Sequence, residues 1–322
     1  MKHPSPLLVF SFYFLVLASA CTKQIEFSGD ETDPMPVMVS YAGADSTLRV
    51  RMTLSRFFLG RDTVRTVDNA SFRVELNGST PASVFSYDGR GMYGSTLALG
   101  EGDTLTLTAS VPGYGEVKAG CRLPARPNVT DFVIVTDDFY GDSLYVYGEM
   151  GFQFTLDDRP GHDYYLVRAF MVKDSTGKKI PLMVSVDDDV IYEDAMSEDV
   201  IDIGTSVDLS YGANVIFTDN NINGRSHTVK GTVMVSGYDY YGDTNLRVWM
   251  EVCSVSRDTY LYLATVKAQS VNDDEMGFLS EPVQIHTNVV GGIGILGAMT
   301  PVRFPLFPLV SEASSHANTH NR

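Results

Sequence analysis

The sequence has few cysteines and none of the patterns in which cysteine usually binds zinc. It contains three cysteines in 322 residues, and no two of them form a Cys-x-x-Cys pair, which argues against a thiolate zinc site. Cys121 and Cys253 lie far apart, in runs that we expect to be strands of different domains. An exported chain could pair them. Two buried free thiols are the better interpretation, because free cysteine packs like a small apolar side chain.

Positive charge is also scarce. The chain has 24 Lys and Arg against 40 Asp and Glu, which gives a formal net charge of −16. Such a chain repels the phosphates of nucleic acids and anionic lipid head groups, so we expect no nucleic-acid partner. The acidity favours solubility and leaves cationic partners or divalent ions as candidates.

Long apolar runs are lacking, apart from one near the start of the sequence. Residues 7–18 form this run, which is shorter than the about 20 residues that a membrane-spanning helix needs. It follows Lys2 and leads into Ala18-Ser19-Ala20-Cys21, which is the layout of a secretory signal, so we expect residues 1–20 to be a signal peptide. Small residues directly before a cysteine resemble a bacterial lipobox, and this resemblance implies that Cys21 is lipidated. Such boxes usually have Leu where this chain has Ala18, and an ordinary signal cut near Ala20 is the alternative.

The rest of the chain alternates in the way that β-strands do. Every second residue is apolar in 47–54, 71–76 and 104–109, and turn dipeptides such as Asn77-Gly78 separate such runs. This period of two predicts short strands and a mainly β fold. The expected organisation is a lipidated tether over 21–36, an immunoglobulin-like β-sandwich over 37–126, a larger β-rich domain with one short helix over 127–303, and a flexible tail over 304–322.

One segment of the second domain predicts a helix. Ser256 is placed to cap it, Asp258 favours the positive end of the helix dipole, and Thr259–Gln269 contains neither Gly nor Pro. The same run also fits a period of two, so a strand is the alternative. The side chains expected to share one face of the helix are Tyr262, Leu263 and Val266.

Two motifs resemble ligand sites but lack a part that the ligand requires. Gly292–Gly297 fits Gly-x-Gly-x-x-Gly, but no strand–helix–strand unit surrounds it. We therefore expect a glycine-rich turn where two backbones approach closely, and no dinucleotide site. Asp219–Gly224 begins like a calcium loop, but position 12 is Lys230, where the ion needs a carboxylate. We expect a hairpin turn at Asn223-Gly224 in place of an EF-hand.

An acidic segment covers residues 187–202. Clustered carboxylates can bind Ca²⁺, but a solvated, mobile loop explains them more simply. The acidic residues of this segment are Asp187, Asp188, Asp189, Glu193, Asp194, Glu198, Asp199 and Asp202.

The candidates for contact with a ligand or partner are aromatic. Tyr238, Tyr240 and Tyr241 lie beside carboxylates in one loop, where they could stack on sugar rings or dock on a partner protein. The alternative is that these tyrosines only continue a strand into its turn. Trp249 shares a strand face with Arg247 and opposes an apolar face, so it is the fourth candidate.

Several phrases, taken in order, resemble those of one family. They are Leu105–Leu107 with Val111–Tyr114, Phe154–Gly161 with Tyr164-Tyr165, Phe217–Asp219 with Ile222–Gly224, and Ser280–Val283 followed by Asn288 and Gly291–Gly297. Together they resemble the DUF4249 family, which comprises lipoproteins of Bacteroidota-type bacteria. The family has no assigned biochemical activity, so the resemblance transfers no catalytic residue. Its members are often encoded beside TonB-dependent outer-membrane receptors, which implies an accessory role at the outer membrane.

We therefore predict a non-enzymatic, lipid-anchored protein of the outer membrane that partners a TonB-dependent receptor in nutrient uptake. The sequence has no His-Glu-x-x-His or Gly-x-Ser-x-Gly motif, and we assign no catalytic residue, metal or cofactor. One alternative is a stand-alone surface lipoprotein that binds or hydrolyses glycans. Another is a purely structural envelope protein. The residues after Cys21 leave open whether the protein faces the periplasm or the cell surface.

Overall fold

The structure is a computed structural model that describes residues 33–44, 46–57, 63–141, 146–173, 177–195, 209, 211–237, 246–275 and 283–308. The chain divides after Asp33, and all elements below belong to the second unit, Pro34–Arg322. Cys21, Tyr238, Tyr240 and Tyr241 lie outside the described residues. The elements are β1 (Pro36–Gly43), β2 (Thr47–Leu54), β3 (Ser71–Leu76), β4 (Phe85–Gly89), β5 (Met92–Ala98), β6 (Thr104–Val111), β7 (Gly115–Arg122), β8 (Val129–Gly141), β9 (Val146–Asp157), β10 (Tyr164–Lys173), β11 (Lys178–Val186), α2 (Asp189–Ala195), β12 (Tyr211–Gly212), β13 (Val215–Thr218), β14 (Ser226–Gly237), β15 (Leu246–Val255), α3 (Arg257–Glu275) and β16 (Ile293–Pro308).

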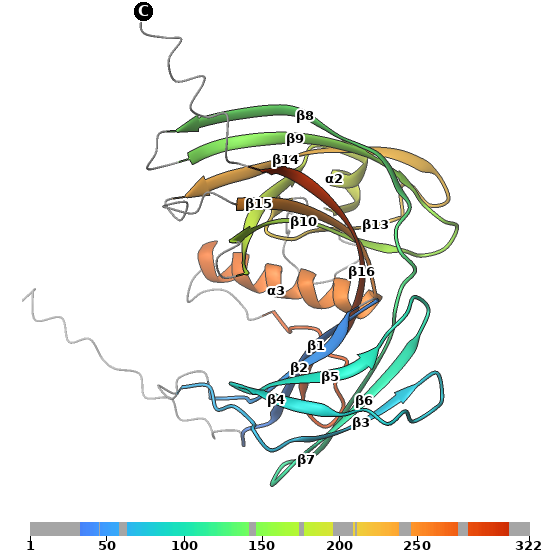
Figure 1. Ribbon diagram of the computed structural model, residues 1–322, viewed down its shortest axis with the longest axis vertical. Helices are drawn as coiled ribbons and strands as arrows, with labels where there is room; N and C mark the ends of the chain where they lie inside the picture. The colour runs from blue at the N-terminus through green and yellow to red at the C-terminus, as the bar shows by residue number, and fades with distance from the viewer. Residues whose placement is uncertain are drawn as a thin grey trace, which may run out of the picture. The chain divides into compact units, whose positions relative to one another are not determined.

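Strands dominate the described part of the chain, which confirms the prediction of a mainly β protein. One sheet of 13 strands has the order β4-β5-β2-β1-β16-β15-β10-β11-β14-β9-β8, and β12 and β13 pair beside this path with β11 and β10. The second sheet contains β3, β6 and β7. Figure 1 shows this smaller sheet beside β1, β2, β4 and β5.

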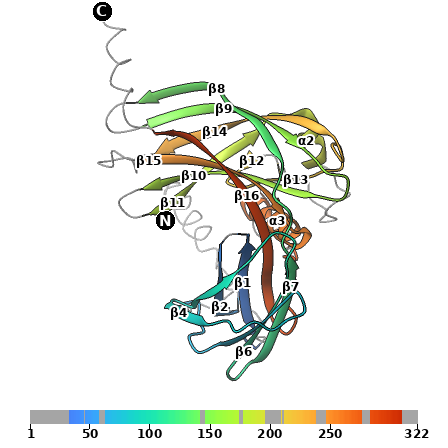
Figure 2. The same cartoon turned by 45° about the vertical axis from the view of Figure 1, so that its right-hand side comes forward.

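Strand β16 joins the two halves of the main sheet. Its residues Ile293–Met299 pair in parallel with β1, whereas Met299–Pro308 pair antiparallel with β15. Figure 2 shows β16 running from its place beside β1 to its place beside β15. The first described strand is therefore hydrogen-bonded to the last one.

A two-layer core lies between the small sheet and the strands around β1. Alternate residues of each strand point into it, including Met38, Leu48 and Leu105. Leu296 of β16 belongs to the same core. The sandwich expected over residues 37–126 thus contains a strand from the far end of the sequence.

The other half of the main sheet has apolar side chains on both faces. On one face, residues of β9, β10, β11, β14 and β15 form a second core. On the opposite face α3 packs through Tyr260 and Ala264 against Leu166 and Cys253. In Figure 1 this helix lies alongside β10 and β16.

The predicted helix exists as α3 and begins where the sequence indicates. The Thr259 N–H donates to Ser256 Oγ at 3.3 Å, which confirms Ser256 as the cap. Tyr262, Leu263 and Val266 share a face of the helix by their spacing, but this is not its buried face, because Val266 is 39% exposed. The buried residues of the helix instead follow a spacing of four, which brings side chains onto one face. They are Tyr260, Ala264 and Ala268, next to Thr259 and Thr265.

The structure also bears on the expected boundaries. The main sheet contains strands from both expected domains, 37–126 and 127–303. The strand pairing therefore does not separate them, and the division into two domains stays a prediction. β1 begins at Pro36, the last residue of the expected tether. A flexible tail from residue 304 is wrong for residues 304–308, which belong to β16. Residues 189–195 form the short helix α2, which the sequence did not predict.

The pairing of β16 with β1 depends on glycine. Gly294 has a φ of +119°, and a Cβ added there would lie 2.1 Å from the Met38 carbonyl oxygen. A Cβ added at Gly292 would lie 2.4 Å from the Pro36 carbonyl oxygen. Only glycine permits this backbone conformation together with this contact. The close approach of two backbones predicted at Gly292–Gly297 is confirmed, although most of this segment lies in a strand and not in a turn.

Replacing Gly294 by alanine should lower the free energy of unfolding by about 2–4 kcal/mol, because the methyl group collides with the backbone of β1. Urea unfolding followed by circular dichroism measures this loss. Gly120→Ala is the matched control, since Gly120 is also a strand glycine but the atoms nearest to an added Cβ are 3.6 Å away. Equal losses in the two variants would contradict the role assigned to Gly294.

The two described cysteines are free and buried, as the sequence favours. Neither Cys121 nor Cys253 forms a disulfide. Burial raises the pKa of each thiol to about 12. Since the thiolate is the reactive form of cysteine, both should be inert in the folded protein.

We therefore expect iodoacetamide at about pH 8 to leave Cys121 and Cys253 unmodified in the folded chain and to modify both after unfolding in urea. Mass spectrometry of the digested protein identifies the modified residues. Carrying out the reaction on Cys21→Ala removes any signal from the third cysteine. Rapid modification of Cys253 without denaturant would show that it is not buried.

Candidate functional site

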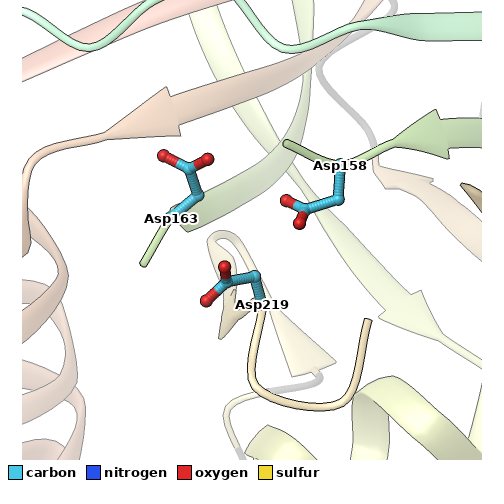
Figure 3. Close-up of side chains that lie close together, drawn as sticks. All are labelled: Asp158, Asp163 and Asp219. Carbon is cyan, nitrogen blue, oxygen red and sulfur yellow. The ribbon is translucent and has the colours of Figure 1, made fainter. Parts of the chain in front are cut away.

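Three aspartates meet where three strands begin or end. Asp158 follows β9, Asp163 precedes β10 and Asp219 follows β13. One carboxylate oxygen of each lies within 4.8 Å of the other two. In Figure 3 the carboxylates of Asp158 and Asp219 point toward the space between the three side chains. We call this cluster the aspartate triad.

Strand pairing brings the triad together. β13 pairs antiparallel with β10, so the residue after β13 is a neighbour of the residue before β10. The Asp219 N–H donates to the Asp163 carbonyl oxygen at 3.1 Å. β14 pairs with β9, and the Asp158 N–H donates to the Arg225 carbonyl oxygen just before β14 at 3.0 Å. The three carboxylates are therefore close only when all four strands are paired.

Asp158 is held in place by hydrogen bonds to both of its carboxylate oxygens. The Tyr165 hydroxyl donates to Oδ1, and the Gly224 N–H donates to Oδ2 at 2.7 Å. The loops after β9 and after β13 are joined further by Gly161 and Asn223. The Gly161 N–H donates to Asn223 Oδ1 at 3.2 Å, and Asn223 Nδ2 donates to the Gly161 carbonyl oxygen.

Within the described part of the chain, Asp219 is buried with one of its two carboxylate oxygens left without a partner. Its side chain belongs to a residue that is only 1% exposed, and its Oδ2 has no hydrogen-bond partner among the described residues. An ionised carboxylate that is buried and unpaired costs several kcal/mol. Two further carboxylates within 4.8 Å add repulsion to this cost.

The pKa values of two members of the triad, Asp219 and Asp163, are raised. Burial raises the pKa of Asp219, the backbone amide of Asp163 acts against this, and the charges of Asp158 and Asp163 raise it further. Burial and the charge of Asp158 also raise the pKa of Asp163, against the Arg159 guanidinium. Burial raises the pKa of Tyr165 as well, so its hydroxyl keeps the proton that it donates to Asp158. These surroundings favour the loss of negative charge.

The segment Asp219–Gly224 forms two successive turns. The Ile222 N–H donates to the Asp219 carbonyl oxygen at 2.9 Å, and the Arg225 N–H donates to the Ile222 carbonyl oxygen at 2.9 Å. The predicted hairpin is wrong, because β13 and β14 on either side pair with other strands. Asp158 and Asp163 were not predicted from the sequence, because a calcium-loop pattern takes all its ligands from one continuous loop. The sequence signal that could have indicated them is an aspartate directly beside the end of each of three strands, β9, β10 and β13.

The acidic segment 187–202 is ordered by hydrogen bonds in its described part. Asp188 Oδ1 accepts from two N–H groups at the start of α2 at 3.1 and 3.2 Å, and His227 Nε2 lies 3.0 Å from both Asp188 oxygens. Asp187 accepts from two hydroxyl groups at 2.9 and 3.0 Å. An open hollow of about 720 Å³ lies beside these residues. The expected mobile loop is wrong for residues 187–195, and residues 196–202 lie outside the described part.

The predicted faces of β15 are confirmed. Val248, Met250 and Val252 are buried in the second core. Trp249 is half-buried and points to the other face, where it is paired with Phe170 of β10. Its contact with a ligand or partner stays a prediction.

Glu251 lies on the same strand and is fully buried between two arginines. Arg168 of β10 and Arg303 of β16 are its direct neighbours in the sheet. Each donates through Nε to one carboxylate oxygen of Glu251 at 2.7 Å. Burial acts to raise the pKa of Glu251, but the two guanidinium groups hold it below its ordinary value. This ion trio ties three adjacent strands together.

Comparison with known families identifies the family to which the ordered sequence phrases belong. The sequence profile of DUF4249, described as a domain of unknown function, matches residues 22–304. The chain belongs to the DUF4249 family. This confirms the family predicted from the ordered phrases. In this DUF4249 protein, Asp158 and Asp219 lie within those phrases, and the last phrase contains the glycines that pack against β1.

Solved structures are far less similar. A DUF4785 family protein from Legionella pneumophila has a TM-score of 0.19 and 10% identity; the match covers 67% of this chain and 51% of the other, so this chain spans about half of that protein's length. The Enterococcus faecalis MSCRAMM ACE, described as binding its ligands by the collagen hug, has a TM-score of 0.17, 10% identity and coverage of 72% and 91%. The collagen-binding domain of the Erysipelothrix rhusiopathiae surface protein RspB has a TM-score of 0.18, 9% identity and coverage of 84% and 96%.

No functionally curated protein matches the chain. Among the described helices, neither combines the length and the apolar character needed to cross a membrane.

Replacing Glu251 by glutamine should lower the free energy of unfolding at neutral pH by about 2–4 kcal/mol, because two guanidinium groups lose their counter-ion. Chemical denaturation measures the loss. Glu149→Gln is the matched control, since Glu149 is an exposed glutamate in the strand β9, and it should change stability by less than about 0.5 kcal/mol.

The gap between the native protein and Glu251→Gln should depend on pH. A carboxylate with a lowered pKa stabilises the fold above its ordinary pKa of 4.5 and loses this contribution as the pH falls through the lower, folded value. The gap should therefore shrink in acid. A gap of constant size from neutral pH down to acid would show that the ion pairs are not its source.

Proposed function

We propose that this DUF4249 protein is a lipid-anchored accessory protein of the outer membrane that binds a TonB-dependent receptor and assists nutrient uptake. The observation that carries the proposal is Cys21, which follows the small residues Ala18-Ser19-Ala20 after an apolar run. Lipidation contributes about 0.8 kcal/mol per buried methylene, and two chains give stable anchoring. β1 begins at Pro36, which leaves a short polar segment between this cysteine and the first strand.

An exposed strand supports the binding part of the proposal. β8 is the terminal strand in the described order of the main sheet. Its consecutive residues Val133, Ile134 and Val135 are 47%, 40% and 59% exposed. A terminal strand with exposed apolar side chains is a surface that another chain can cover. A receptor barrel is the partner that we propose for this surface.

Growth with radiolabelled palmitate followed by detergent capture tests both parts. We expect label in the native protein and none in Cys21→Ala, because the thiol that carries the lipid is gone. Cys121→Ala is the control and should keep the label. A native protein without label would contradict the anchor.

Capture in mild detergent should bring down a receptor barrel with the native protein. The double variant Val133→Lys, Val135→Lys should lose the barrel and keep the palmitate label, because two charges are placed on the proposed contact. Val84→Lys is the control, since Val84 is 68% exposed at another place, and it should retain the barrel. If the native protein brings down no barrel, the partnership is wrong; if the double variant retains it, β8 is not the contact.

A further inference from the structure

We propose that the aspartate triad is a binding site for a divalent cation, and that Ca²⁺ is the ion it takes. Two independent observations carry this inference. One oxygen of each carboxylate lies within 4.8 Å of the other two. Asp219 is 1% exposed, has one carboxylate oxygen without a hydrogen-bond partner among the described residues, and points toward the space between the three side chains (Figure 3). The inference does not depend on the anchor or the receptor.

The spacing of the carboxylates fits calcium. Ca²⁺ binds oxygen at about 2.3–2.6 Å, so two oxygens on opposite sides of the ion are about 5 Å apart. Three oxygens within 4.8 Å of one another are therefore near the spacing that one shared Ca²⁺ requires, and a small shift of the side chains would close the shell. Mg²⁺ binds at about 2.0–2.1 Å in strict octahedral geometry, so it holds opposite oxygens only about 4.2 Å apart. Water and carbonyl groups would complete the larger and more flexible calcium shell.

The negative charge of the site also favours the binding of a cation. The triad brings three carboxylates together, and the positive group that acts on Asp163 is Arg159, whose side chain belongs to an exposed residue. A bound Ca²⁺ offsets the repulsion among all three carboxylates and supplies a partner for Asp219 Oδ2. The competing arrangement is a proton shared within the triad.

The protein orients the site before an ion arrives. Asp158 accepts one hydrogen bond at each oxygen, from Tyr165 and from Gly224. A carboxylate has about four acceptor positions, so both oxygens keep a free position for the ion. The bond from the Asp219 N–H to the Asp163 carbonyl oxygen, at 3.1 Å, holds the other two aspartates side by side.

Calorimetric titration of the full chain tests the proposal, after purification in mild detergent and removal of metals with EDTA. We expect CaCl2 to release or absorb heat and to raise the Tm by about 4 °C at 100 times the Kd. MgCl2 should have a smaller effect at equal concentration.

Asp219→Asn should abolish the calcium response while leaving the Tm of the metal-free protein equal or higher, because it removes a buried charge and keeps the shape. A merely structural role for Asp219 predicts the opposite, a lower Tm. Asp163→Asn is a second variant with the same expected loss of response. Asp189→Asn is the control from the acidic segment, and it should respond to calcium like the native protein.

Three results would overturn the assignment. An absence of heat and of a Tm shift at millimolar CaCl2 would mean that the triad does not bind calcium. A response lost in Asp189→Asn but kept in Asp219→Asn would place the ion at the acidic segment. An equal or larger response to Mg²⁺ would exclude calcium as the preferred ion. None of these outcomes bears on palmitate labelling or receptor capture.

Discussion

The parallel pairing of β16 with β1 is the constraint on which the rest of the structure depends. β16 supplies Leu296 to the two-layer core and Leu306 to the second core. The Ala298 N–H of the same strand donates to Thr259 Oγ1 at 2.9 Å, which ties the start of α3 to it. One strand therefore positions two cores and a helix. Because β1 is the first described strand and β16 the last, this pairing closes a very long loop, and such contacts carry a large entropic cost before they contribute stability.

Two buried carboxylates show how differently the same desolvation cost can be met. Glu251 lies between Arg168 and Arg303, so its charge is neutralised within the sheet. Asp219 is equally inaccessible, but its nearest ionisable groups are two more carboxylates. The trio of Glu251 is complete and needs no further group, whereas the triad is short of positive charge. Of these two buried charge clusters, the triad is therefore the one whose negative charge is not neutralised by neighbouring cations among the described residues.

Local patterns in the sequence predict much of the fold. Alternation predicts the strands around 47–54, 71–76 and 104–109, and the glycines of 292–297 predict a close backbone contact, because these features depend on neighbouring residues alone. The partner of those glycines could not be predicted, since it lies at the other end of the chain. The face of α3 was missed because its buried stripe uses small residues such as Ala264 and not the larger Val266. The helix α2 was missed because an acidic run resembles a solvated loop, and the hydrogen bonds from α2 to Asp188 are visible only once the chain has folded.

The triad shows why a calcium motif can fail as a pattern while its first residue still belongs to a cation site. An EF-hand draws its ligands from one continuous loop, so it can be recognised from spacing. Here Asp219 occupies the first position of such a loop, but Lys230 at the twelfth belongs to β14, and the remaining carboxylates come from the ends of two other strands. A site of this kind exists only while β13 is paired with β10 and β14 with β9. Cation binding at the triad would therefore stabilise those pairings directly, because the ion binds the folded state and finds no assembled site in the unfolded chain.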